Sequence, residues 1–222
     1  MQKGHTGSGN KVILAIPQFD LFLRKISEMQ QAAEHSPVIK TRKKILTYDD
    51  YVALTPSDSG NYELHNGKII YMASPTPRHQ DVAMNLSARM FLHASNKDLG
   101  KVYQAPLDIK FDEVNTFQSD IVFISKKHLS IVGKKKIDGA PDLVVEILSE
   151  SNKPKEMSYK KYIYESYLVK EYWLINLEKS SVAVYHNAEG ELLLLGIFSP
   201  NDVIESKVLV GFKISVKEIL DV

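Results

Sequence analysis

The chain has 222 residues, with 28 basic and 27 acidic side chains and a net charge of +1, so its global charge indicates no polyanionic partner. It contains no cysteine, which excludes a disulfide scaffold and a thiolate zinc site. Its hydrophobic content of 44% allows an ordinary packed core. No apolar run approaches the roughly 20 residues of a membrane-spanning helix, so we expect a soluble cytoplasmic protein.

The N-terminal part is expected to be an extension over residues 1–40, followed by a main domain over residues 41–222. Apolar residues at helical spacing predict an amphipathic helix over residues 18–34. The stripe consists of Phe19, Phe22, Leu23, Ile26 and Met29. This helix is expected either to contact a partner or to pack on the main domain.

The main domain opens with a short helix and a hairpin. Thr47 is suited to cap a helix over residues 47–54. The pair Asn66–Gly67 is a strong two-residue turn signal, so residues 61–65 are predicted to pair with residues 68–73. The elements that follow are a helix over 78–95, strands over 101–111 and 117–124, a loop or short helix over 125–138, a strand over 141–148, a helix over 152–168, a strand over 171–177, a hairpin of 181–187 with 191–198, and a final short strand with a helical turn.

The stretch GAPDLVVEILS at residues 139–149 carries the main functional signal. Its apolar, β-prone residues predict a strand buried on both faces. Asp142 and Glu146 nevertheless lie within it, and they share a face because side chains alternate along a strand. A carboxylate in such a strand is costly unless it is paired, protonated or bound to a metal. The strand–helix–strand order from 141 to 177 predicts a right-handed crossover between parallel strands.

Asp120 is a second acid of this kind, because it immediately precedes an apolar run over residues 121–124. If the two strands are neighbours, Asp120 and Glu146 approach one another, and a bound divalent cation or a shared proton resolves their repulsion. Oxygen ligands without cysteine favour Mg²⁺, Mn²⁺ or Ca²⁺. The alternative is that both acids lie at strand ends and pair with lysines.

Lys160 is expected to reach the same place from the following helix. The i, i+4 spacing places Lys160 on one stripe with Tyr164, whereas Lys161 lies about 100° away. Glu146 lies roughly 10 Å back from the strand end, and Lys160 lies roughly 10 Å along the returning helix, so the two can come level. The alternative is a lysine whose head group reaches solvent at the edge of the stripe.

Two further candidates carry weaker signals. Glu63 is either a fourth metal ligand or a surface residue of the hairpin. His79, beside Arg78 at a predicted helix start, either contacts phosphate or simply caps the helix. Asp142 is expected to organise the start of its strand; the alternative is that it reaches the metal side of the sheet, because it lies on the same strand face as Glu146. The chain has no G-x-S-x-G, P-loop or G-x-G-x-x-G motif, so nucleophile-elbow, nucleotide-driven and dinucleotide chemistry are unsupported.

In chain order, YELHNGKIIYM, SPTPRHQ, SDIVFI, GAPDLVVEILSES and EYWLIN resemble the Uma-two (Uma2) family of endonucleases, over about residues 46–187. The family is assigned to the PD-(D/E)XK, restriction-endonuclease-like superfamily. The resemblance implies an α/β fold with a mixed sheet flanked by helices. It also implies Mg²⁺-dependent (or Mn²⁺-dependent) hydrolysis of nucleic-acid phosphodiesters, with DNA as the expected substrate, although the residues do not distinguish DNA from RNA.

Carried over by position, the resemblance makes Asp120 and Glu146 metal ligands, with Glu63 as a supporting ligand. The sequence departs from the superfamily pattern at Leu148, where a lysine is usual, and Lys160 takes the helix position that some members use instead. Its expected role is to orient or deprotonate the attacking water, or to stabilise the transition state. Ser119 stands where proline is frequent. Backbone phosphate contacts are expected from the lysines flanking the site, which include Lys153, Lys155 and Lys161.

The alternative function is a catalytically inactive nucleic-acid-binding or protein-interaction module on a nuclease scaffold, because a fold alone does not establish activity. A two-fold homodimer is the expected assembly, since two sites cut both strands of a duplex most directly.

Overall fold

The computed structural model describes residues 44–55, 61–148 and 154–221. The predicted helix over 18–34 lies outside these ranges, and the division between the extension and the main domain therefore stays a prediction. No helix within the described ranges is both long enough and apolar enough to cross a lipid bilayer.

The first elements of the main domain form as predicted. Helix α2 (Tyr48–Leu54) is capped by Thr47, whose hydroxyl accepts from the Asp50 N–H while the Asp50 side chain returns to the Thr47 N–H. Strands β1 (Asn61–His65) and β2 (Lys68–Met72) pair antiparallel. Their turn places Asn66 at φ 48° and Gly67 at φ 67°, the left-handed conformation that an Asn–Gly turn supplies at low cost.

A six-stranded mixed sheet forms the centre of the described domain, in the order β11-β10-β9-β8-β6-β3. Strands β8 and β9 are parallel, and helix α4 (Pro154–Ser166) lies between them in the chain, which confirms the parallel pair predicted on either side of that helix. The strands are β3 (Gly100–Gln104), β6 (Ile121–Ser125), β8 (Leu143–Leu148), β9 (Glu171–Asn176), β10 (Ser181–Ala188) and β11 (Glu191–Phe198).

The predicted strands over 101–111 and 117–124 were wrong in their continuity, because each is divided between two sheets. The first becomes β3 and β4 (Ile109–Lys110), and the second becomes β5 (Thr116–Phe117) and β6. Pro106 has no N–H to continue a ladder, so the chain leaves the large sheet there. Strands β4 and β5 join a five-stranded sheet in the order β2-β1-β5-β4-β7, where β7 is Ile137–Asp138.

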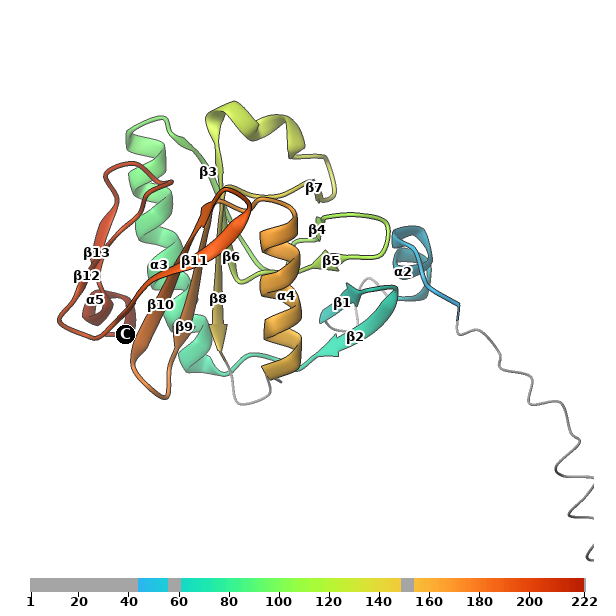
Figure 1. Cartoon of the computed structure of the whole chain (residues 1–222), viewed down its shortest axis with the longest axis horizontal. Helices are drawn as coiled ribbons and strands as arrows, with labels where there is room; N and C mark the ends of the chain where they lie inside the picture. Colours follow the sequence, from blue (N-terminus) through green and yellow to red (C-terminus); the bar gives the residue numbers. More distant parts are fainter. Residues whose placement is uncertain (1–43, 56–60, 149–153, 222) are drawn as a thin grey trace, which may run out of the picture. The chain divides into compact units, whose positions relative to one another are not determined.

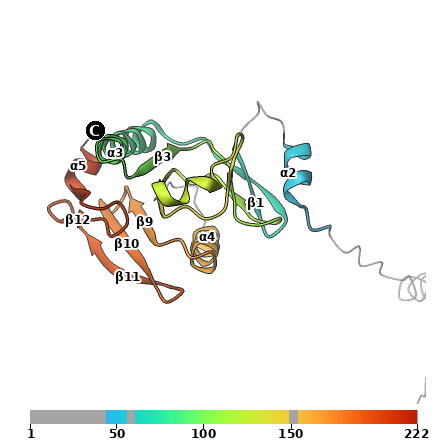
Figure 2. The same ribbon diagram turned by 90° about the horizontal axis from the view of Figure 1, so that it is seen from above.

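Two separate cores cover the two faces of the six-stranded sheet. Figures 1 and 2 show helix α4 over one of these faces. On one face, Leu143, Val145 and Ile147 pack with helix α3 (Pro77–Asn96) and with the C-terminal elements β12 (Val203–Glu205), β13 (Lys213–Ser215) and α5 (Val216–Leu220). On the other face, Val144 packs with α4 and the small sheet. Glu146 shares the second face by alternation, which directs its side chain toward α4. The 3₁₀ helix η1 (Lys126–Ile131) lies in the predicted loop between β6 and β8.

Candidate active site

Asp120 reaches the end of β8 because it lies in the link between the two sheets. The residue directly precedes β6, and Ile121 pairs with Val145 in the antiparallel β6–β8 ladder. Asp120 Oδ2 accepts a hydrogen bond of 2.7 Å from the Ile147 N–H. This bond holds Asp120 beside Glu146, one residue earlier on β8.

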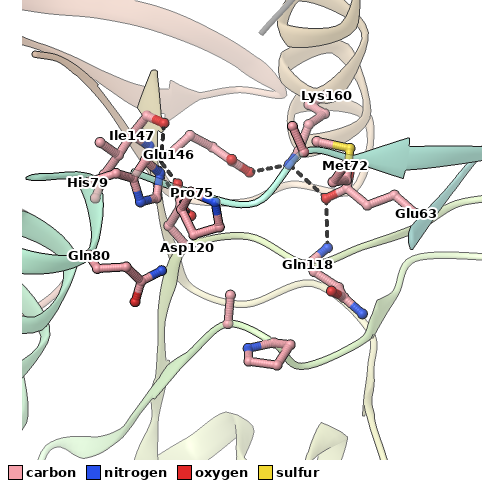
Figure 3. A pocket seen from close by; sticks show the side chains of 13 residues that line it. Glu63, Met72, Pro75, His79, Gln80, Gln118, Asp120, Glu146, Ile147 and Lys160 are labelled. Atoms are coloured by element: carbon pink, nitrogen blue, oxygen red, sulfur yellow. Dashed lines mark hydrogen bonds and ion pairs between the residues drawn. The ribbon is translucent and has the colours of Figure 1, made fainter. Parts of the chain in front are cut away.

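Lys160 comes level with Glu146 from α4. Its Nζ lies 2.7 Å from Glu146 Oε1 and 3.0 Å from Glu63 Oε1. Only 3% of the Lys160 side chain is exposed, so its charge is compensated by these two carboxylates rather than by water. Figure 3 shows Lys160 between the two acids, with Glu146 on one side and Glu63 on the other.

Glu63 is a buried residue of β1 and not a surface residue of the hairpin. Its Oε1 accepts from Lys160 and, at 2.8 Å, from the Gln118 N–H, while its Oε2 lies 2.6 Å from His65 Nε2. The His65 ring packs against Phe117, with ring centroids 4.7 Å apart. Both oxygens of Glu63 thus have protein partners, and these contacts hold Oε1 against Lys160.

Tyr164, one helical turn after Lys160, holds Glu146 from the same helix. Its hydroxyl donates to Glu146 Oε1 and lies 2.9 Å from the Ser119 hydroxyl. The ring is fully buried. Glu146 Oε1 is therefore approached by both Lys160 and Tyr164, which restricts its rotamer.

The three acids and the lysine line one pocket of about 120 Å³. We call it the acid–lysine pocket, and its lining includes Glu63, Asp120, Glu146 and Lys160. His79 also lines it: its Nε2 lies 3.2 Å from the Ile147 carbonyl oxygen and 3.4 Å from Asp120 Oδ1. His79 Nδ1 is buried without a hydrogen-bond partner among the described residues.

The pKa values of Glu146 and Glu63 are shifted in opposite directions. Burial, together with the charges of Asp120 and Glu63, raises the pKa of Glu146 above its ordinary value despite the nearby Lys160 ammonium. Burial also acts to raise the pKa of Glu63, but Lys160 and His65 outweigh it and hold that pKa below its usual range. Burial lowers the pKa of Lys160, and the two carboxylates reverse this effect, so the lysine stays protonated.

Comparison with known proteins supplies the classification. Residues 48–217 match the model of the Uma2 family, described as "Putative restriction endonuclease". The chain belongs to the Uma2 family. A solved structure from Anabaena variabilis, described as a putative nuclease belonging to DUF820, is similar in fold, with a TM-score of 0.68 and 18% identity. That match covers 79% of this chain and 98% of the other, and no curated protein matches.

The basic residues predicted to contact nucleic-acid phosphates, other than His79, were not found in the lining of the pocket among the described residues. Arg78 and Lys155 are exposed and do not line it, and Lys153 lies outside the described residues. Lys161 donates to the Leu192 carbonyl oxygen, 3.3 Å away. Asp142 organises the start of β8, where it pairs with Lys170 and accepts from the Ser125 N–H, and it does not line the pocket.

The sequence predicted no site role for three supporting residues, although it placed one of them, Tyr164, on the stripe of Lys160. Tyr164 follows Lys160 at the i, i+4 spacing, and His65 follows Glu63 at the i, i+2 spacing of a strand face, so periodicity carried a signal for both. Gln118 contributes its main-chain N–H, for which no side-chain pattern exists.

The carboxylates of the pocket fit a magnesium-type cation. Within the described ranges, no three His, Asp or Glu side chains converge to form a complete metal site. Mg²⁺ nevertheless commonly takes one or two carboxylates and completes its shell with waters and substrate phosphate. Asp120 and Glu146 line one pocket. His79 Nε2 lies close both to the Ile147 carbonyl oxygen and to Asp120 Oδ1. Burial is the main cause of the raised pKa of Glu146, with the charges of Asp120 and Glu63 adding to it, and a bound cation would favour the ionised form of this carboxyl.

Proposed function

We propose that this Uma2 protein is a divalent-metal-dependent endonuclease that hydrolyses phosphodiester bonds of nucleic acid, with DNA as the expected substrate. The observation that carries the proposal is the meeting of Asp120, Glu146 and Lys160 in one pocket of a chain from a restriction-endonuclease family. A scaffold that only binds has no need to bury charged groups such as Glu146 and Lys160, and such burial is costly.

Asp120 and Glu146 are the residues that would hold Mg²⁺ or Mn²⁺. Bound there, the cation would lower the pKa of a coordinated water and neutralise charge on the phosphate. We assign Glu63 to holding Lys160, because its Oε1 accepts from the lysine ammonium at 3.0 Å; as a metal ligand it would have a supporting role only.

Lys160 acts in this proposal as a hydrogen-bond donor and not as a base. Its pKa is raised by the two carboxylates, so at neutral pH it carries three N–H donors and no lone pair. Two of these directions are taken by Glu146 and Glu63. The third can orient the attacking water or donate to a phosphate oxygen, where positive charge stabilises the transition state.

The test combines metal binding with cleavage. Wild type, Asp120→Asn and Glu146→Gln are titrated with MgCl₂ and MnCl₂ by calorimetry and then incubated with supercoiled plasmid, single-stranded DNA and RNA. We expect saturable binding and cleavage in the wild type, with both lost in the two variants. Glu165→Gln is a matched control, since this half-buried acid of α4 does not line the pocket.

The outcomes separate the two candidate functions. Cleavage that survives Glu146→Gln would place the chemistry elsewhere. Absence of both metal binding and cleavage in the wild type, with nucleic acid present, would favour the inactive scaffold, in which Lys160 alone neutralises the buried acids.

A further inference from the structure

We propose that the free edge of β3 and the neighbouring exposed stripe of α3 form a two-fold interface with a second copy of this chain. The inference concerns the assembly and does not depend on the catalytic proposal. Its surface is distinct from the acid–lysine pocket, although Ala105, the first residue after β3, lines that pocket.

Strand β3 ends the six-stranded sheet, and no described strand pairs with its outer side. On the inner side, Ala105 N–H donates to the Asp120 carbonyl oxygen and Lys126 N–H donates to the Leu99 carbonyl oxygen. In an antiparallel ladder, inward and outward peptide groups alternate, so odd-numbered residues here face β6. The N–H and C=O groups of Val102 and Gln104 consequently face outward.

Helix α3 presents an apolar stripe beside this edge. Met84, Ala88 and Phe91 follow one another at helical spacing, and Met84 and Phe91 are 61% and 55% exposed. Together with β3 they border a hollow of about 220 Å³ whose lining includes Val102 and Gln104. Exposed apolar side chains next to unpaired strand groups are the combination that favours association with another strand.

The edge is complementary to itself. When two copies of β3 run antiparallel around a two-fold axis at Tyr103, Val102 of each copy faces Gln104 of the other. Each such pair exchanges two main-chain hydrogen bonds, which is the closed, self-matching contact of a two-fold dimer. The α3 stripes then lie on the same side of the joined sheet, where they can cover one another. This self-match is the reason for choosing a second copy rather than an unrelated strand.

The opposite edge of the sheet is less suited to pairing. Strand β11 also exposes apolar side chains, including Leu194 at 50%. However, the Leu192 N–H and C=O on β11 are already bonded by Glu165 and Lys161 from α4. The β10–β11 ladder also contains a register shift, and such irregularities twist an edge away from flat pairing. Within the described part of the chain, edge β3 shows neither feature.

The first experiment compares two adjacent positions of α3 in the full-length chain. Phe91→Glu places a charge on the proposed interface, and Leu92→Glu places the same charge on a residue that is 58% exposed but does not line the hollow. Molecular mass is measured by sedimentation equilibrium over a concentration series. We expect the mass of two chains for the wild type and Leu92→Glu, and the mass of one chain for Phe91→Glu.

Cross-linking tests the register, because the chain has no cysteine of its own. In Tyr103→Cys, the two introduced thiols face each other across a non-hydrogen-bonded pair with Cα atoms about 4.5 Å apart, which suits a disulfide. Lys101→Cys is the control, since its copies are displaced by four residues. We expect a cross-linked dimer only with Tyr103→Cys.

A monomeric wild type over the whole concentration range would overturn the proposal. A dimer that persists in Phe91→Glu, or that dissociates in Leu194→Glu instead, would also overturn it and would direct attention to β11 in the second case. Because no outcome involves cleavage, failure of the nuclease proposal would leave this result intact.

Discussion

Removal of the Lys160 charge is the perturbation whose cost the structure defines most clearly. In Lys160→Met, Glu63 and Glu146 lose a partner at 3.0 Å and 2.7 Å while remaining 1% and 7% exposed as side chains. Leaving buried carboxylates without their cation costs about 3–5 kcal/mol. We expect the free energy of unfolding at pH 7 to fall by that amount, measured by urea denaturation with the fluorescence of the single tryptophan, Trp173, which is fully buried.

The pH dependence of this variant has a definite sign. Burial and the charges of Asp120 and Glu63 already raise the pKa of Glu146, and loss of the Lys160 charge raises it further, so the folded state of the variant binds more protons than the unfolded chain. Its stability then rises as the pH falls toward 5, and the deficit relative to wild type shrinks. Lys161→Met is the matched control: this neighbour is 33% exposed, and its change should cost below about 1 kcal/mol. A loss below about 1 kcal/mol for Lys160→Met at pH 7 would refute the ion-pair reasoning.

Three further predictions concern other parts of the domain. Tyr164→Phe removes the hydroxyl that donates to Glu146, and thermal denaturation should show a loss of about 1–3 kcal/mol; an unchanged melting temperature would contradict the hydrogen-bond role. Burial raises the pKa of Asp142, but hydrogen bonds led by that from Lys170 outweigh it and hold the pKa below its ordinary value. Asp142 therefore contributes stability above its unfolded pKa that is lost as the pH falls through its folded pKa, and Asp142→Asn should lose less stability than wild type between pH 5 and pH 2 in urea titrations. Gly100→Ala adds a Cβ that would clash with the Ile124 carbonyl oxygen, at a residue with φ +150°, so chemical denaturation should show a loss of about 1–3 kcal/mol; full stability would mean that the backbone there relaxes freely.

Local periodicity accounts for what the sequence predicted well. Alternation along β8 placed Glu146 on the face toward α4, and the 3.6-residue repeat of α4 placed Lys160 on the face toward the sheet. Short-range turn and cap chemistry gave the Asn66–Gly67 hairpin and the Thr47 cap. These features depend only on residues a few positions apart, so they can be read without knowing the fold.

The breaks in the two predicted strands could not be read in the same way. A run such as residues 117–124 has the same apolar pattern whether it forms one strand or two short ones in different sheets. Pro106 marks a break in the first predicted strand, but the sequence does not show which strand the segment after it pairs with. In the structure that segment is β4, which pairs with β5 and β7 in the five-stranded sheet. The choice depends on which distant strands offer free edges.

By itself the sequence predicted the parallel pair around α4 and the strand and helix faces that carry Glu146 and Lys160, because periodicity is a local property, whereas the mixed α/β class was implied by the resemblance to a family. Only the tertiary structure decided that Glu63 accepts from Lys160, Gln118 and His65. That arrangement needs the small sheet to lie against the large one across the link at residues 118–120. Contacts between distant strands follow from packing of whole surfaces, and no spacing along the chain encodes them.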